Sequence, residues 1–312
     1  MNVGVRMLKR TWPSMLLLVC SLLLSGAAAA QEIAITFDDL PAHSALPQGQ
    51  TRVGIAEAIV HALHEAGVPP TYGFVNGIRF TDTSEAAAVL KMWRDTGNPL
   101  GNHTYSHMDL AKNSLAAWEE DVLRNEPFLR DASRPGDDWH WLRFPYLSES
   151  ATEPKRNDAR AFLMQHGYRI AAVTMSFGDY AWNEPYARCV AKGDQQAIDH
   201  LKVTYLDAAK DDAQYRRTLA KAAFGKDIPY VLLMHLGALD AQLLPRLLAM
   251  YKAAGFRFVS LQQAEQNPFY ANDLNLALPS SPDTLEAAAK AKDVADWPKH
   301  KGLPPELETM CR

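Results

Sequence analysis

Residues 33–41 read Ile-Ala-Ile-Thr-Phe-Asp-Asp-Leu-Pro, an apolar and β-branched run that stops at a proline. Such a run predicts a short buried strand. Asp38 and Asp39 lie at its end, where two adjacent carboxylates repel each other and lose hydration unless a cation or a proton holds them. The stretch therefore predicts a buried strand with a charged site at its mouth.

Six further apolar runs follow along the chain. The seven predicted strands are 32–37, 71–75, 98–102, 140–144, 169–175, 229–234 and 256–261. Helical periodicity fills most of the segments between them, at 51–66, 84–96, 114–126, 155–167, 195–223 and 241–254, with Pro127 expected to stop or kink the third. Alternating strands and helices indicate a parallel sheet, and seven units favour a closed or nearly closed barrel. An open doubly wound sheet is the alternative.

Both ends of the chain are expected to lie outside this repeating pattern. Residues 1–30 combine a positive start, a short apolar core and small residues before Gln31, which is typical of a cleaved secretory signal. Residues 31–264 would form one domain. Residues 265–312 would be a C-terminal tail, packed on the barrel or partly loose, with no chemistry of its own. We therefore expect a periplasmic or secreted protein that has no membrane contact after signal cleavage.

The charge of the chain excludes some partners. Its formal net charge is −4, which becomes −7 without the three basic residues of the signal, and no basic run stands out. Nucleic acid and anionic membranes are therefore poor candidates, and no protein partner can be inferred. Cys189 and Cys311 remain in the mature chain, either as a disulfide that ties down the tail or as two separate thiols.

Distinctive polar residues follow the ends of five predicted strands. They are Asp38, Asp39, His103, His107, Arg143, Asp179 and His235. In parallel α/β folds the carboxyl ends of the strands form the rim where ligands bind. His103 and His107 are four residues apart and would lie on one side of a helical turn, where they can hold one metal ion with a nearby carboxylate. The pattern predicts a metal-dependent hydrolase.

Five short motifs, taken in order, resemble those of the polysaccharide deacetylases, the NodB-homology enzymes of carbohydrate esterase family 4. The motifs are Thr36-Phe37-Asp38-Asp39, His103-x-x-x-His107, Arg143-Phe144-Pro145-Tyr146, Asp179-Tyr180 and Leu233-Met234-His235. The resemblance spans about residues 32–262. It implies a distorted (β/α)7 barrel, here with a C-terminal extension.

The resemblance also implies a metal site. Asp39, His103 and His107 correspond to the family's metal ligands, and zinc is the usual ion. Two nitrogens and one carboxylate oxygen leave positions open for water and substrate, as a catalytic site requires. Such an ion would acidify a water molecule and polarise an amide or ester carbonyl.

Proton transfer is implied for a second group of residues. Asp38 resembles the general base, and Arg143 resembles the residue that keeps it ionised and oriented. The backbone N–H of Tyr146 resembles an oxyanion donor. His235 resembles the general acid that protonates the leaving amine, with Asp179 fixing its tautomer and raising its pKa.

The chain departs from the family pattern in the substrate cleft. Leu40 stands where a glycine is usual, and Ser176 and Tyr180 stand where an acidic residue and a tryptophan are usual. Trp182 could replace that tryptophan as a wall of the pocket. The expected substrate-binding residues are Pro145, Tyr180, Trp182 and Leu233, and His43, just past the aspartates, could touch substrate.

The leading expectation is a metal-dependent deacetylase that removes N- or O-acetyl groups from a carbohydrate polymer or oligomer. One alternative is a hydrolase of a cyclic or linear non-sugar amide at the same site. Another is a carbohydrate-binding protein without turnover.

Overall fold

A computed structural model of the chain describes residues 1, 3–4, 31–41, 43–80, 84–150, 152–278, 284–295 and 297–312. The expected signal segment lies almost entirely outside the described residues. Within the described ranges, no helix combines the length and the apolar character needed to cross a membrane.

Seven parallel strands form the centre of the molecule, at the seven places that the sequence predicts. They are β1 (Gln31–Leu40), β2 (Gly73–Val75), β3 (Leu100–Asn102), β4 (Trp141–Leu142), β5 (Arg169–Ile170), β6 (Tyr230–His235) and β7 (Phe256–Val259). The strand order is β5-β4-β3-β2-β1-β6, and β7 pairs with the first residues of β1. Every pairing is parallel, which agrees with helical crossovers between consecutive strands.

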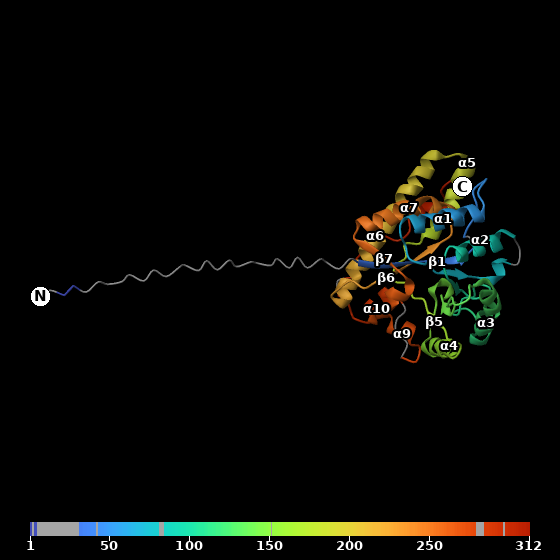
Figure 1. Ribbon diagram of the computed structural model, residues 1–312. Coiled ribbons are helices and arrows are strands. Elements are labelled where there is room, and N and C mark those ends of the chain that lie inside the picture. The colour runs from blue at the N-terminus through green and yellow to red at the C-terminus, as the bar shows by residue number, and fades with distance from the viewer. Residues whose placement is uncertain are drawn as a thin grey trace.

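The sheet curls until its two ends meet. After β5 the chain continues to Met175, which forms a parallel bridge with Leu232 of β6. The amide of Leu233 donates to the Met175 carbonyl at 3.1 Å. This contact joins the segment after β5, at one end of the strand order, to β6 at the other end. The fold is therefore the distorted (β/α) barrel, and the open doubly wound alternative is wrong. Figure 1 shows the helices arranged around the strands.

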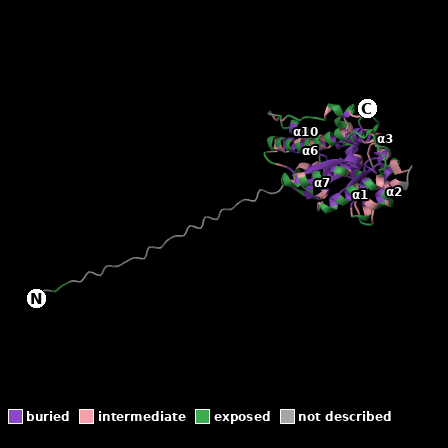
Figure 2. Cartoon of the chain, turned by 90° about the horizontal axis from the view of Figure 1, so that it is seen from above, coloured by how far each residue is buried: buried purple, intermediate pink, exposed green. Residues whose placement is uncertain are grey.

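Helices surround this sheet. They are α1 (Arg52–Glu65), α2 (Ser84–Asp95), α3 (Leu115–Ala132), α4 (Glu153–Gln165), α5 (Asn183–Lys192), α6 (Gln195–Phe224), α7 (Ala238–Ala253), α8 (Leu261–Glu265), α9 (Ala271–Leu274) and α10 (Leu285–Lys290). Short 3-10 turns are η1 (Gly77–Phe80), η2 (Pro145–Leu147), η3 (Asp179–Trp182), η4 (Pro268–Tyr270) and η5 (Pro305–Glu308). Figure 2 shows buried strands in the interior and exposed outer helix faces.

Two helices differ from the sequence-based expectation. Pro127 does not stop α3, which continues to Ala132. The proline removes one backbone donor, but Leu129 beyond it is fully buried, so packing holds the last turn in place. The sequence pattern also missed α5 (Asn183–Lys192), which follows the fifth strand's loop directly.

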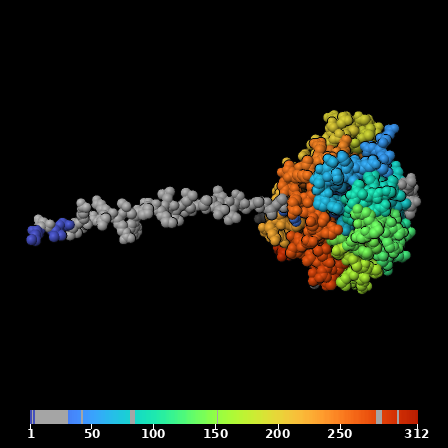
Figure 3. All heavy atoms as spheres, viewed as in Figure 1, coloured from blue at the N-terminus to red at the C-terminus, as the bar shows by residue number. Residues whose placement is uncertain are grey.

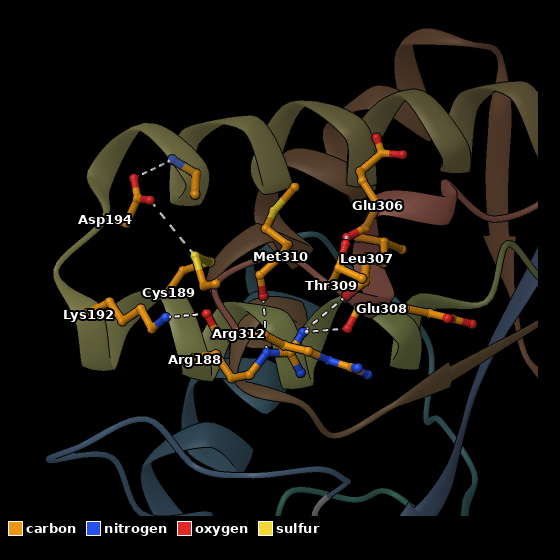
Figure 4. Close-up of a disulfide and its surroundings, with 12 residues drawn as sticks. Arg188, Cys189, Lys192, Asp194, Glu306, Leu307, Glu308, Thr309, Met310 and Arg312 are labelled. Carbon is orange, nitrogen blue, oxygen red and sulfur yellow. Dashed lines mark hydrogen bonds between the residues drawn. A yellow bond between two sulfur atoms is a disulfide. The ribbon is translucent and has the colours of Figure 1, made fainter.

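The C-terminal tail packs on the barrel at several points. Arg160 of α4 donates to the carbonyl of Asn272 at 3.1 Å, and in Figure 3 the orange-red C-terminal part lies beside the green α3 and α4 region. Farther along, a disulfide joins Cys189 of α5 to Cys311 (Figure 4). The two cysteines are therefore bridged rather than separate thiols. Arg188 donates to the carbonyl of Met310 at 3.1 Å.

Candidate active site

The candidate base and acid are neighbours on the rim of the barrel. Asp38 of β1 pairs in register with His235 of β6. Paired residues on adjacent parallel strands project from the same face of a sheet, about 4.8 Å apart in the hydrogen-bonding direction. Residues that are 197 positions apart in the sequence therefore face one cavity side by side.

Arg143 holds Asp38 from behind. Its Nη1 lies 3.0 and 3.2 Å from the two Asp38 carboxylate oxygens. Nη2 donates to the Thr36 hydroxyl at 3.0 Å, and Nε donates to the Ala171 carbonyl at 2.7 Å. The arginine is fully buried. A guanidinium fixed by three partners presents its charge to Asp38 in one orientation, so the carboxylate is held in place.

Asp39, His103 and His107 form a cluster beside this pair. The Asp39 Oδ1 atom lies 3.7 Å from His103 Nε2 and 3.6 Å from His107 Nε2. This Oδ1 atom is buried and has no hydrogen-bond partner among the described residues. Ligands bound at about 2.0–2.2 Å to one tetrahedral ion lie roughly 3.4 Å from one another. An orphaned carboxylate oxygen facing two imidazole nitrogens at this spacing fits a divalent metal ion.

Both imidazoles are prepared to act as ligands. The His103 Nδ1 atom lies 2.7 Å from the backbone carbonyl oxygen of Arg143, so this nitrogen carries the proton and Nε2 presents its lone pair to the cluster. Burial, followed by the nearby His103, lowers the pKa of His107 to about 4. His107 is therefore neutral near pH 7, which ligation of a metal requires.

The two histidines do not lie on a helical turn, so that part of the sequence interpretation is wrong. His103 follows β3 directly, and the segment to His107 is an irregular loop. Thr104 has a φ of 58°, a value that ends any helical path. Asp121 of α3 holds the loop, accepting from the Ser106 amide at 2.9 Å. Tertiary hydrogen bonds rather than helical spacing bring the two rings together.

Left-handed backbone conformations gather at this site. Asp39 has a φ of 60°, His107 of 60° and Tyr146 of 58°. For residues other than glycine this region costs of the order of 1–3 kcal/mol each and persists where the surrounding structure enforces it. Two candidate ligands and the candidate oxyanion donor are therefore held in place by the fold at an energetic cost, as is typical of preorganised sites.

His235 is oriented by Asp179 of η3. The His235 Nδ1 atom lies 3.1 Å from one Asp179 oxygen, and the His235 amide donates to the other at 2.6 Å. Burial by itself would lower the pKa of His235, but the charge of Asp179 and its hydrogen bond outweigh burial and raise that pKa to about 9. The imidazole is therefore protonated near pH 7 and can donate a proton.

These groups face a cavity of about 500 Å3. Of the expected substrate-binding residues, Tyr180 and Leu233 line it, whereas Trp182 and Pro145 do not. In a 3-10 turn, residues three apart share a face; Trp182 therefore follows Asp179 inward, is fully buried and donates to the Thr204 hydroxyl at 3.1 Å. Pro145 is buried at the start of η2 and directs Tyr146 into the cavity instead.

Two residues close to Asp39 carried little or no signal in the sequence. His43 lies 3.8 Å from Asp39, and its ring centre is 4.8 Å from that of His235. Arg79 of η1 lies 3.5 Å from Asp39, and no motif marks it. Burial alone would raise the pKa of Asp39, but His103 and Arg79 lower it to about 2, so the carboxylate is ionised at neutral pH.

The tail also reaches the cavity. We expected no part for it in the chemistry, yet three of its residues form part of the wall. They are His300, Gly302 and Leu303. No strand or helix pattern around them indicates where the tail turns back, so the sequence offered no signal for this contact.

Comparison with known proteins agrees with this arrangement. Residues 25–171 match the sequence profile of the polysaccharide deacetylase family. A chitin deacetylase of Arthroderma benhamiae is 30% identical over 126 residues, which are 39% of this chain and 30% of that protein.

Solved structures share the fold at low sequence identity. A variant of the peptidoglycan deacetylase PdaC from Bacillus subtilis matches with a TM-score of 0.51 and 18% identity, covering 76% of this chain and 91% of that one. A CE4 family pseudoenzyme from Bacillus anthracis matches with a TM-score of 0.51 and 14% identity, covering 76% and 66%. One barrel therefore occurs both in a deacetylase and in a pseudoenzyme, and activity depends on the site residues.

Proposed function

We propose that the chain, whose residues 25–171 match the polysaccharide deacetylase family, is a metal-dependent hydrolase that removes acetyl groups from an acetylated carbohydrate. The strongest support for this proposal is the arrangement of five side chains around one cavity. The orphaned Asp39 oxygen and two imidazole nitrogens converge next to an oriented carboxylate and an oriented imidazolium. A base, an acid and a candidate metal site around one cavity are the parts that amide hydrolysis needs.

Asp39, His103 and His107 would hold the ion, and zinc suits this nitrogen-rich ligand set. When bound, a divalent ion lowers the pKa of water and polarises the acyl carbonyl. The protein prepares this site by keeping His107 neutral and by fixing the tautomer of His103.

The residues around it would carry the protons. Asp38, held in place by Arg143, would take the proton of the attacking water as the new C–O bond forms. The N–H of Tyr146 lies on the loop that enters the cavity and would donate to the developing oxyanion. His235 then donates its proton to the leaving nitrogen or oxygen as that bond breaks, which an amine requires in order to leave.

The compartment is part of the proposal. We infer that the mature protein acts in the periplasm or outside the cell, which the signal-like residues 1–30 and the Cys189–Cys311 disulfide support. An acetylated glycan of the cell envelope or the surroundings would be its substrate there.

A panel of acetylated glycans tests the function. The mature protein should release acetate from at least one of chitin oligosaccharides, peptidoglycan fragments, acetylated exopolysaccharide or acetylated xylan, and a chelator should abolish the release until zinc is restored. The Asp38→Asn variant serves as the inactive control. Hydrolysis of a cyclic amide without acetate release from any glycan would favour a non-sugar amidase. Glycan binding without turnover would favour a binding protein.

A further inference from the structure

The tail wall of the cavity consists of His300, Gly302 and Leu303, and Leu303 is its apolar member. Leu303 remains 43% exposed, although large apolar side chains usually find cover in a folded chain. Tyr146 and Tyr180, also exposed, line the same cavity. Exposed apolar side chains that gather at one concave site indicate contact with a ligand.

Leu303 lies on the acid side of the site. It lies against Gly178, the residue before Asp179: a Cβ atom built on Gly178 would come within 2.9 Å of the leucine side chain. Gly178 also has a φ of 74°. Only glycine combines this backbone conformation with so close an approach. The loop that supplies Asp179 is thus shaped to receive the tail.

The tail is fixed on both sides of Leu303. Before it, His300 Nε2 lies 3.3 Å from an Asp212 oxygen of α6. After it, Arg188 of α5 donates to the Leu307 carbonyl at 3.1 Å, and the disulfide to Cys311 closes the connection, as Figure 4 shows. A segment held at both ends presents its middle residues as a rigid wall.

We propose that Leu303 is a specificity-determining residue, which packs against the sugar that carries the leaving group. This inference rests on the proposed function, because His235 then marks the side where the leaving nitrogen or oxygen emerges. The ring attached to that atom presents an apolar C–H face. Tyr180 packs against His235, and Leu303 lines the same cavity at Gly178, next to the acid's partner Asp179; both side chains are exposed. Residues of the tail would therefore select the substrate, while residues of the barrel cleave it.

Kinetics on substrates of different size test this assignment. Leu303→Ala should raise KM for an acetylated oligosaccharide about tenfold, the loss typical of removing part of an apolar pocket. Most of the loss should fall on KM rather than kcat, and turnover of 4-nitrophenyl acetate should fall by less than about twofold, because this small ester lacks the sugar. Leu278→Ala is the matched control, since Leu278 is 41% exposed and does not line the cavity.

Binding provides a readout that does not depend on turnover. Calorimetry of the oligosaccharide with Asp38→Asn, and with Asp38→Asn combined with Leu303→Ala, should show about tenfold weaker binding in the double variant. Unchanged KM and unchanged binding in the Leu303 variants would overturn the assignment. Equal losses on the oligosaccharide and on 4-nitrophenyl acetate would also overturn it, because Leu303 would then support the site as a whole. A loss in kcat with the alkaline limb moved to lower pH would overturn it too, because Leu303 would then act by supporting Asp179.

The same data separate the two proposals. If the wild-type protein releases no acetate from any glycan, the proposed function fails. If it releases acetate and Leu303→Ala matches Leu278→Ala in KM and binding, only the specificity assignment fails.

Discussion

The rim of the barrel and the tail wall reach the same cavity by different means. On the rim, Asp38 and His235 occupy neighbouring strands in register, and backbone pairing sets their positions. On the wall, Leu303 lies in a segment without strand or long helix, held by side-chain contacts and one disulfide. The sheet thus places the candidate base and acid, whereas a peripheral segment forms part of the cavity wall. Substitutions on the rim should therefore impair the chemistry, and substitutions in the tail should impair binding or stability.

The largest effect should come from the candidate metal ligands. His103→Ala and His107→Ala should lose bound zinc and all measurable turnover, because each removes one of three ligand atoms. Elemental analysis of the purified proteins measures this directly. His64→Ala, which removes a solvent-exposed imidazole, is the control. Wild-type zinc content in both variants would show that the cluster does not hold the metal.

The carboxylate pair should divide by role. Asp38→Asn should keep its zinc but lose about 10²–10⁴-fold in kcat, since it removes a proton acceptor rather than a ligand. Asp39→Asn should lose zinc as well. Parallel metal analysis and acetate assays distinguish the two. Equal zinc content in both variants would contradict the assignment of Asp39 as the ligand.

The acid should respond to the leaving group and to pH. His235→Ala should reduce amide hydrolysis about 10²-fold or more, and hydrolysis of an aryl acetate much less, because a phenolate leaves without a proton. As the proposed acid, His235 would act in its protonated form, so activity should fall as the pH rises through its pKa of about 9. Asp179→Asn removes the charge that raises this pKa and should shift the alkaline limb of kcat/KM to lower pH. An unmoved limb would show that another group titrates there.

The smallest effect on chemistry should come from removing the Cys189–Cys311 disulfide, which holds the tail on α5. Cys311→Ser should lower the free energy of unfolding by about 2–4 kcal/mol, measured by denaturant titration. Aryl acetate turnover should change by less than about twofold, because the barrel rim keeps its geometry. Wild-type protein in reducing buffer is the matched comparison. A large loss on the small ester would mean that the tail supports the rim itself.

The strand ends could be predicted from the sequence because their pattern is local. The apolar run before Asp38 and the run before His235 each predict a buried strand. Because the strands of a parallel sheet end at the same edge, their carboxyl ends lie close together. The family motifs added the pairing of Asp38 with Arg143 and of His235 with Asp179, and these pairs lie within hydrogen-bond distance.

Features that depend on tertiary contacts could not be predicted from the sequence. The loop from His103 to His107 takes its shape from Asp121 of α3, and spacing alone suggested a helix. Trp182 points into the core because residues three apart in a 3-10 turn share a face, and Asp179 of the same turn η3 is buried. The place of Leu303 depends on contacts with distant helices, which no local pattern encodes.

Arg143 serves the site twice, once with its side chain and once with its main chain. Its guanidinium restrains Asp38, and its carbonyl oxygen fixes the ring of His103. Substitution can alter the first contribution but not the second, because every amino acid brings the same carbonyl. A substitution at Arg143 would therefore remove the restraint on Asp38 and leave the backbone contact that orients His103. On the proposed function, an inactive descendant of this protein would arise in one step and keep the three candidate metal ligands, so metal content alone would be a poor diagnostic of an active relative.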